Sequence, residues 1–219
     1  MSKEVIAIDG PAGAGKSTVA KLLAARLGFT YLDTGAMYRA VALLATRANQ
    51  MTAEEAGRIA DTMDLKFTPS ESGQKLVVNG EDVTGAIRTP EIGETASSLS
   101  AYSEVRKPLV SRQRQLIDQE RVVLEGRDTT TVVCPDARLK IFLTASVKER
   151  ARRRYLEFAD KPGAPSLEEI EKSIAERDHR DSTREDSPLR VAEEAVVVDT
   201  DSMSVEEVVD TILAEWKKA

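Results

Sequence analysis

The chain has 219 residues and 41% hydrophobic residues, so it is long enough for one domain with its own core, and intrinsic disorder is excluded as its main description. Its 37 acidic residues outnumber 31 basic ones, and the formal net charge of −6 argues against a protein that coats nucleic acid. The single cysteine, Cys134, cannot form an internal disulfide, and the longest apolar run, Ala40 to Ala45, is far shorter than the roughly 18 residues of a membrane helix. We therefore expect a cytoplasmic protein with no secretory signal, no membrane partner and no nucleic acid partner.

The N-terminal part alternates buried strands with amphipathic helices. Residues 4–9 form a short apolar run before a glycine, which is typical of a buried parallel strand, and residues 16–27 show helical spacing. A second strand is expected at 29–32, followed by helices at about 36–47 and 53–64. This alternation predicts an α/β fold with a parallel core sheet.

Residues 65–88 interrupt the alternation. Short β-favouring pieces at 65–67 and 75–78 come before Asn79-Gly80, a dipeptide typical of a hairpin turn. We expect a small antiparallel insert here, with two helices after it at about 91–100 and 103–119.

The second half returns to buried strands, at 122–125 and 139–143, and then becomes highly charged. An arginine-rich helix at 147–159, a Pro/Gly joint at 160–165 and a charged helix at 167–184 together predict a mobile helical lid. The chain closes with an expected strand at 195–199 and an amphipathic helix at 205–216, whose Trp216 is predicted to pack against the core.

The strongest motif matches G-x-x-x-x-G-K-[ST] between the first strand and the first helix, which is the context that identifies a P-loop. Backbone N–H groups of such a loop wrap phosphates, the lysine reaches the β and γ phosphates, and the serine hydroxyl binds Mg²⁺. The sequence therefore predicts an ATP site that uses Mg²⁺, with Ser17 as the metal ligand. The predicted ATP-binding residues are Gly10, Pro11, Ala12, Gly13, Ala14, Gly15, Lys16, Ser17 and Thr18.

The N-K-x-D string that reads guanine is absent, which excludes a GTPase switch. Many arginines instead follow the loop, and three of those in the Arg-rich helix share one helical face: Arg150, Arg153 and Arg154. Guanidinium groups concentrated in an acidic protein indicate that a second phosphate chain is bound. Phosphoryl transfer between two nucleotides is the reaction that requires this.

Several strings resemble the bacterial cytidylate kinases, in order and over essentially the whole chain. They are Asp33-Thr-Gly-Ala-Met-Tyr-Arg39, the insert ending Val78-Asn-Gly-Glu-Asp-Val-Thr-Gly-Ala-Ile-Arg-Thr-Pro90, Glu125-Gly-Arg-Asp128, and Glu176-Arg-Asp-His-Arg-Asp181 with Arg184. The resemblance implies ATP-dependent phosphorylation of CMP and dCMP to the diphosphates; separately, we expect a monomer. It also implies a core (1–64, 101–146 and 185–219), a nucleoside-monophosphate-binding insert (about 65–100) and a lid (about 147–184).

The resemblance further implies roles for individual residues. It places the acceptor phosphate among Thr34, Arg39, Arg127 and Arg184, the ribose near Tyr38, Arg177 and Asp181, and the cytosine near Ser97, Arg106 and Asp128. A carboxylate such as that of Asp128 can accept a hydrogen bond from the cytosine N4 amino group, whereas uracil presents an acceptor at O4. Catalysis is expected from Lys16, Arg127, Arg153 and Arg184.

Two departures from the family pattern lie after Gly126-Arg-Asp128. Thr129 and Thr130 stand where an apolar residue and a glycine are usual, and Cys134 stands where a phenylalanine is usual. If the glycine permits a positive φ or a close approach of another part of the chain, Thr130 is expected to strain the turn that aims Arg127 and Asp128, and to reduce activity. Cys134 is otherwise expected to be a small apolar filler.

Some assignments remain open from the sequence. Asp33 and Glu125, at predicted strand ends, would either hold the water shell of Mg²⁺ or cap neighbouring structure, and His179 is expected to be an exposed helix residue. The alternatives to a cytidylate kinase are a P-loop kinase for another small acceptor, such as UMP or a coenzyme precursor, and a non-catalytic nucleotide-sensing module.

Overall fold

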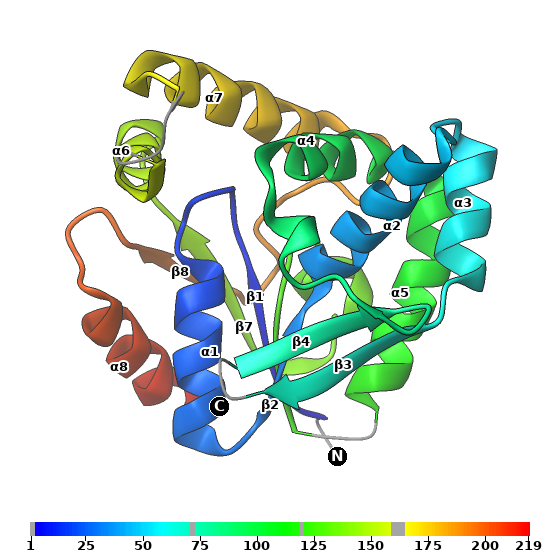
Figure 1. Cartoon of the computed structure of the whole chain (residues 1–219). Helices are drawn as coiled ribbons and strands as arrows, with labels where there is room; N and C mark the ends of the chain where they lie inside the picture. Colours follow the sequence, from blue (N-terminus) through cyan, green and yellow to red (C-terminus); the bar gives the residue numbers. More distant parts are fainter. Residues whose placement is uncertain (1–2, 71–72, 119–120, 159–164) are drawn as a thin grey trace. The chain divides into compact units, whose positions relative to one another are not determined.

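The computed structural model describes residues 3–70, 73–118, 121–158 and 165–219 (Figure 1). The chain divides into two units: the first runs up to Leu32 and resumes at Leu116, and the second is Asp33–Gln115.

A five-stranded sheet with the order β2-β6-β1-β7-β8 organises the first unit. Strand β1 pairs in parallel with β6 and β7, and β7 pairs in parallel with β8, which confirms the predicted parallel core sheet. All of β6 is buried, as expected for a strand covered on both faces. The strands are β1 (Lys3–Asp9), β2 (Thr30–Asp33), β6 (Val122–Glu125), β7 (Ala137–Thr144) and β8 (Val196–Asp199).

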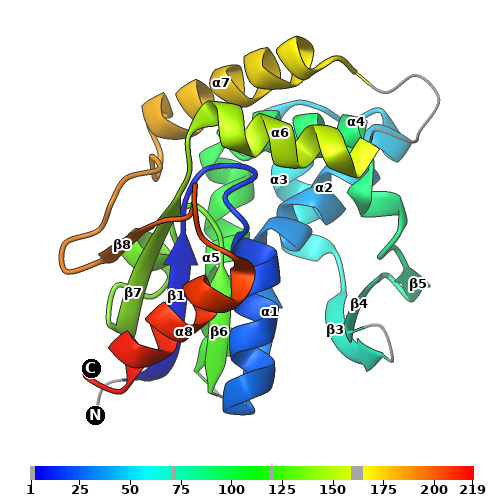
Figure 2. The same ribbon diagram turned by 90° about the vertical axis from the view of Figure 1, so that its left-hand side faces the viewer.

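Helices α1 (Lys16–Leu27) and α8 (Val205–Trp216) pack side by side against this sheet (Figure 2). Their apolar side chains join those of β1 and β7 in one core, which includes Ile6, Leu23, Ile141 and Ile212. Trp216 packs against this core and meets Phe29 edge-on with ring centroids 5.6 Å apart, as predicted for the closing helix.

Helices α6 (Val147–Phe158) and α7 (Leu167–Thr183) pack against each other through Ala151, Ile170 and Ile174. A capping box of Ser166 and Glu169 starts α7. Except for Pro165, the expected Pro/Gly joint at 160–165 lies outside the described residues. The sequence did not predict the π-helical turn Thr129–Val133, which follows β6.

The second unit combines helices with the small antiparallel sheet β3-β4-β5. Its core lies where α2 packs on α3 and α4. Asn79 (φ 50°) and Gly80 (φ 84°) turn the chain between β4 and β5, which confirms the predicted hairpin. The elements are α2 (Thr34–Ala48), α3 (Ala53–Thr62), β3 (Leu65–Ser70), β4 (Gly73–Val78), β5 (Glu81–Asp82), the 3₁₀ turn Ala86–Arg88, α4 (Pro90–Leu99) and α5 (Ser103–Ile117). The last two residues of α5 are assigned to the first unit.

Across the four described ranges, no helix is both long enough and apolar enough to cross a membrane.

Candidate active site

The P-loop joins the carboxyl end of β1 to α1, and two of its glycines are required by its path. A Cβ on Gly10 would lie 1.9 Å from the carbonyl oxygen of Leu143, so only glycine lets the loop pass β7 this closely. Gly15 has φ 88° and caps α1, and a Cβ built there meets nothing within 4 Å. This open space at the N-terminus of a helix fits a phosphate group, because free backbone N–H groups and the helix dipole favour an anion there.

Lys16 begins α1 and folds back over the loop. Its Nζ donates a hydrogen bond of 2.7 Å to the carbonyl oxygen of Pro11, and its side chain is buried. Burial and the positive charge of Arg127 lower the pKa of Lys16 to about 7. Ser17 and Thr18 follow in the first turn of α1, and both are exposed.

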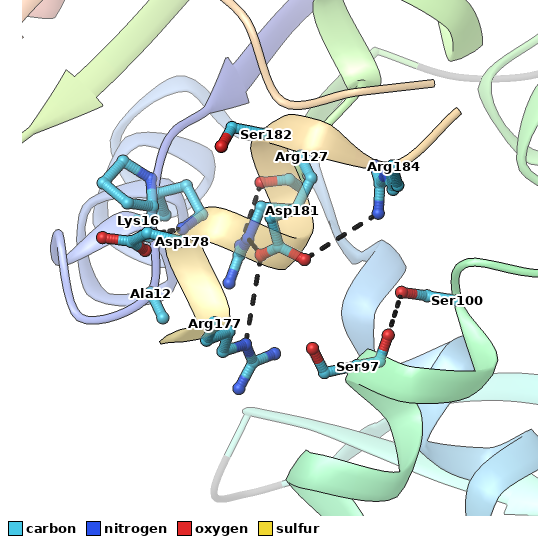
Figure 3. Close-up of polar contacts among 12 residues, drawn as sticks. Ala12, Lys16, Ser97, Ser100, Arg127, Arg177, Asp178, Asp181, Ser182 and Arg184 are labelled. Atoms are coloured by element: carbon cyan, nitrogen blue, oxygen red, sulfur yellow. Dashed lines mark hydrogen bonds and ion pairs between the residues drawn. The ribbon is translucent and has the colours of Figure 1, made fainter. Parts of the chain in front are cut away.

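Three arginines converge on Asp181 within the first unit (Figure 3). Arg127 Nε donates to Asp181 Oδ2 at 2.9 Å, while Arg177 and Arg184 each lie 4.0 Å from the same carboxylate. Burial would raise the pKa of Asp181, but the three guanidinium groups hold it below its usual value. Three cations around one buried anion leave an excess of positive charge, which suits a second phosphate group.

The arginines of α6 are placed very differently from one another. Arg150 is 4% exposed and donates to the carbonyl oxygens of Ala145 and Ala12 at 2.9 and 3.0 Å, and to Asp178 at 2.6 Å. It therefore ties the P-loop to α7, a role that the sequence did not assign to it.

Arg153, predicted to be catalytic, donates to Glu149 and to the hydroxyl and carbonyl oxygens of Thr200. These bonds hold its guanidinium on the segment after β8. Arg152 and Arg154 lie at the surface.

The turn after Asp128 is unstrained at Thr130. In the described ranges, the residues other than glycine with positive φ are Asn49, Asn79, Ser187 and Glu194. Strain from a positive φ at Thr130 is therefore wrong as an expectation, because the backbone of Thr130 does not adopt that conformation. Cys134 is completely buried, which confirms its predicted place in the interior, and His179 is exposed on α7 as predicted.

In the second unit, Ser97, Arg106 and Tyr38 form one group. The guanidinium of Arg106 is buried, lies 5.4 Å from the ring centre of Tyr38 and donates to the carbonyl oxygen of Ser100. The hydroxyl of Ser100 donates in turn to the carbonyl oxygen of Ser97 (Figure 3). The Ser97 hydroxyl is buried without a hydrogen-bond partner among the described residues, which marks it as available to a ligand.

The two strand-end carboxylates have separate environments. Asp33 caps α2 by accepting from Ala36 N at 2.8 Å and pairs with Arg39 at 2.7 Å, so the capping alternative holds for this residue. Glu125 accepts from the hydroxyl of Tyr31 at 2.9 Å. In the part of the chain that the structure describes, no cluster of three or more His, Cys, Asp or Glu side chains could hold a metal ion.

The predicted site residues are thus divided between the units. The first contains the P-loop, Arg153 and the Arg127, Asp128, Arg177, Asp181 and Arg184 group, and the second contains Thr34, Tyr38, Arg39, Ser97 and Arg106. Sequence reasoning missed Asp9 and Arg150. Asp9 directly precedes the P-loop, which was a usable signal, whereas nothing in the arginine run distinguishes Arg150 from its neighbours.

Comparison with known proteins identifies the family. The family model described as cytidylate kinase matches residues 6–218. The cytidylate kinase of Carboxydothermus hydrogenoformans is 52% identical over 210 residues, covering 95% of each chain. That of Streptococcus gordonii is 50% identical over 222 residues, covering 100% of this chain and 98% of the relative.

The fold is also shared with a solved structure of more distant sequence. A gluconokinase from Sinorhizobium meliloti superposes with a TM-score of 0.54 at 15% identity, covering 99% of this chain and 93% of that one. Because the family match spans nearly the whole chain, and the two relatives match it at about half of the aligned positions, the chain belongs to the cytidylate kinase family.

Proposed function

We propose that the protein transfers the terminal phosphoryl group of ATP to CMP and dCMP. The observation that carries this proposal is the convergence of Arg127, Arg177 and Arg184 on Asp181, in the same unit as the P-loop. A protein that only senses one nucleotide needs a single phosphate-binding site. A kinase that transfers a phosphoryl group between two nucleotides needs two phosphate-binding sites, and this chain offers the P-loop and the arginine group.

The P-loop suits the donor. Lys16 lies where a triphosphate would enter the loop, and the exposed hydroxyl of Ser17 fits a ligand of the Mg²⁺ that accompanies ATP. The bound Mg²⁺ would supply charge neutralisation between the β and γ phosphates. Lys16 would then exchange its bond to Pro11 for bonds to phosphate oxygens.

The arginine group suits the acceptor phosphate. The phosphate of CMP is already anionic, so no general base is needed to activate it. Arg127 and Arg184 would orient the attacking oxygen and neutralise the charge that builds during transfer, and Thr34 and Arg39 of the second unit would bind the same phosphate. Arg177 and Asp181 would hold the ribose, as Tyr38 would from the second unit. Arg153 would act on the donor side.

Three side chains suit a cytosine. The Ser97 hydroxyl and the Arg106 guanidinium are donors for its O2 and N3 atoms, and the Asp128 carboxylate is an acceptor for its N4 amino group. The buried Ser97 hydroxyl, which has no partner in the described chain, supports a polar ligand at this position. Asp128 is 4% exposed, so a hydrogen bond to it would be shielded from water.

We also propose that the protein acts as a monomer of three parts, with the core, insert and lid at the boundaries given above, and that it works in the cytoplasm.

The test is an ATP-coupled assay of the purified protein across CMP, dCMP, UMP, AMP and GMP. We expect CMP and dCMP to give the highest kcat/KM and UMP a lower value, because Asp128 would repel the O4 atom of uracil. If UMP is the best acceptor, the assignment of the base site is wrong. If no nucleoside monophosphate is phosphorylated, the kinase function itself is wrong.

A further inference from the structure

Asp9, the last residue of β1, carries a carboxylate that is completely buried and bound by four donors. Its Oδ1 accepts from the backbone N–H and the hydroxyl of Thr129 at 2.9 and 2.7 Å. Its Oδ2 accepts from the backbone N–H and the hydroxyl of Thr130 at 2.7 and 2.6 Å. All three residues are at most 2% exposed, so water does not compete for these bonds. We call this arrangement the Asp9 clamp.

The two threonine hydroxyls complete the clamp. The N–H groups of residues 129 and 130 open the π-helical turn Thr129–Val133, and any pair of residues other than proline would supply them. A carboxylate has about four lone-pair sites, so two N–H groups alone would leave half of them unsatisfied in a dry interior. Only side chains with a short hydroxyl at both positions supply the remaining two bonds.

The Asp9 clamp connects the P-loop to the segment that carries Arg127 and Asp128. On one side of it, Asp9 is followed by Gly10, whose backbone passes so close to Leu143 that a Cβ would clash with the Leu143 carbonyl oxygen. On the other side, Thr129 is preceded by Arg127 and Asp128. The clamp therefore fixes the start of the P-loop to the chain that presents the acceptor-side arginine and carboxylate.

The charge of Asp9 depends on these bonds. Burial raises its pKa above the ordinary value, the negative charge of Asp128 raises it further, and the hydrogen bonds from Thr130 and Thr129 lower it. Two cations, Lys16 and Arg127, also interact electrostatically with Asp9. Removing the hydroxyls would make the carboxylate easier to protonate, and a protonated oxygen is a poor acceptor for the N–H groups of the turn.

We propose that Thr129 and Thr130 are positioning residues for the acceptor: their hydroxyls hold the Asp9 carboxylate so that Arg127 and Asp128 keep a fixed place relative to the P-loop. This inference rests on the proposed kinase function. It concerns residues that touch neither nucleotide and act through Asp9.

The test compares Thr129→Val, Thr130→Val and the double variant with the parent enzyme. Valine keeps the branched shape and removes the hydroxyl. We expect kcat/KM for CMP to fall about 10-fold or more in the double variant, with KM for CMP rising and KM for ATP changing less than 2-fold. We also expect the acid limb of the pH profile for CMP to move to higher pH, because Asp9 protonates more readily when the hydroxyls that lower its pKa are removed.

Two further variants separate positioning from a general loss of structure. Thr129→Ser and Thr130→Ser keep the hydroxyl and should restore both the CMP constants and the acid limb. Thr131→Val is the matched control, because the Thr131 hydroxyl lies in the same turn, is buried and makes no hydrogen bond within the described chain. It should leave KM for CMP and the pH profile at parent values.

Each outcome decides the proposal. A double valine variant with parent constants for CMP and an unmoved acid limb would overturn it. Equal losses for CMP and ATP that serine does not restore would also overturn it, since they indicate a structural role only. Failure of the parent enzyme to phosphorylate CMP would instead reject the proposed function, so the two failures are distinguishable.

Discussion

Lys16 donates a hydrogen bond of 2.7 Å to the carbonyl oxygen of Pro11, so the P-loop lysine is held by the backbone of its own loop. Because this ammonium is buried and faces the charge of Arg127, its pKa is lowered to about 7. A triphosphate that binds in the loop must therefore replace the Pro11 carbonyl and also favour the protonated amine. Both the affinity for ATP and the pH dependence of that affinity should therefore depend on the protonation of Lys16.

Lys16→Ala should lose most of the phosphoryl transfer rate. Removing one preorganised donor from a site where charge develops costs about 100- to 1000-fold in kcat. Single-turnover transfer from ATP to CMP measures this step directly, with circular dichroism to check that the variant is folded. A folded variant that keeps a transfer rate within a few-fold of the parent would show that the loop does not serve this reaction.

Binding of MgATP should take up a proton above neutral pH. Because its pKa is lowered to about 7, Lys16 is largely neutral at pH 8, and a bound triphosphate returns it to the charged form, so MgATP binding at pH 8 should be accompanied by proton uptake. Calorimetric titrations in two buffers of different ionisation enthalpy measure the number of protons taken up on binding. Lys16→Arg is the control, because an arginine stays charged and should take up almost none. Parent and variant with the same proton uptake would contradict the assignment to Lys16.

Lys16 should also make the free energy of unfolding depend on pH. The pKa of Lys16 is about 7 in the folded chain and near 10.5 in an unfolded one, so the folded state binds fewer protons between these values. The contribution of Lys16 to the free energy of unfolding should therefore rise with pH between about 7 and 10.5. Denaturation midpoints of the parent and of Lys16→Met across this range test the sign, and a difference between them that does not change with pH would contradict it.

Arg150→Lys should weaken both the fold and the binding of ATP. Arg150 reaches Ala145, Ala12 and Asp178 with one planar guanidinium, and a lysine ammonium cannot bridge all three acceptors. Loss of a buried charged hydrogen bond predicts a decrease of about 2 kcal/mol in the free energy of unfolding. The Kd for ATP should rise as well, because the Ala12 carbonyl belongs to the P-loop.

The matched control for this prediction is Arg154→Lys on the same helix. Arg154 is 46% exposed, and ion pairs at the surface are worth little, so its replacement should change stability by less than about 0.5 kcal/mol. Urea denaturation and calorimetry of both variants make the comparison. Equal changes in stability and in the Kd for ATP at the two positions would show that the contacts of Arg150 do not contribute more than those of a surface arginine.

Local patterns predicted most of the fold, because they act over a few residues. Helical spacing predicted α1 at its observed bounds, and Asn79-Gly80 predicted the hairpin, since a positive φ is needed at both positions. The π-helical turn Thr129–Val133 was not predictable in this way. Its first two N–H groups are bound by Asp9, which lies 120 residues earlier in the chain, so local spacing does not reveal their partner.

Local patterns were also insufficient for the candidate active site. The sequence identified the arginines as a class but could not rank them: Arg150 and Arg153 lie one turn apart, yet one binds the P-loop and the other binds Thr200. Burial decides between them, and burial depends on which elements pack against α6. The strain expected from a positive φ at Thr130 was wrong, because the backbone conformation of the turn could not be read from the sequence around it.

Asp128→Asn should change the choice between CMP and UMP. The carboxylate accepts from the N4 amino group of cytosine in the proposed site, whereas an asparagine amide can turn its NH₂ group toward the O4 atom of uracil. One charged hydrogen bond in a closed site is worth about 1.5 to 3 kcal/mol. The ratio of kcat/KM for CMP to that for UMP should therefore fall by about 10- to 100-fold, with UMP unchanged or improved.

The ratio separates base reading from the other roles open to Asp128. If the carboxylate instead supports Arg127, both substrates should lose activity together and the ratio should stay near its parent value. Asp136→Asn provides the control, because Asp136 is exposed in the same segment and its neutralisation should leave both substrates unaffected. Steady-state constants for CMP and UMP, measured side by side for the parent and the two variants, decide the matter. An unchanged ratio in Asp128→Asn would remove this residue from the base site and leave Ser97 and Arg106 as its remaining polar groups.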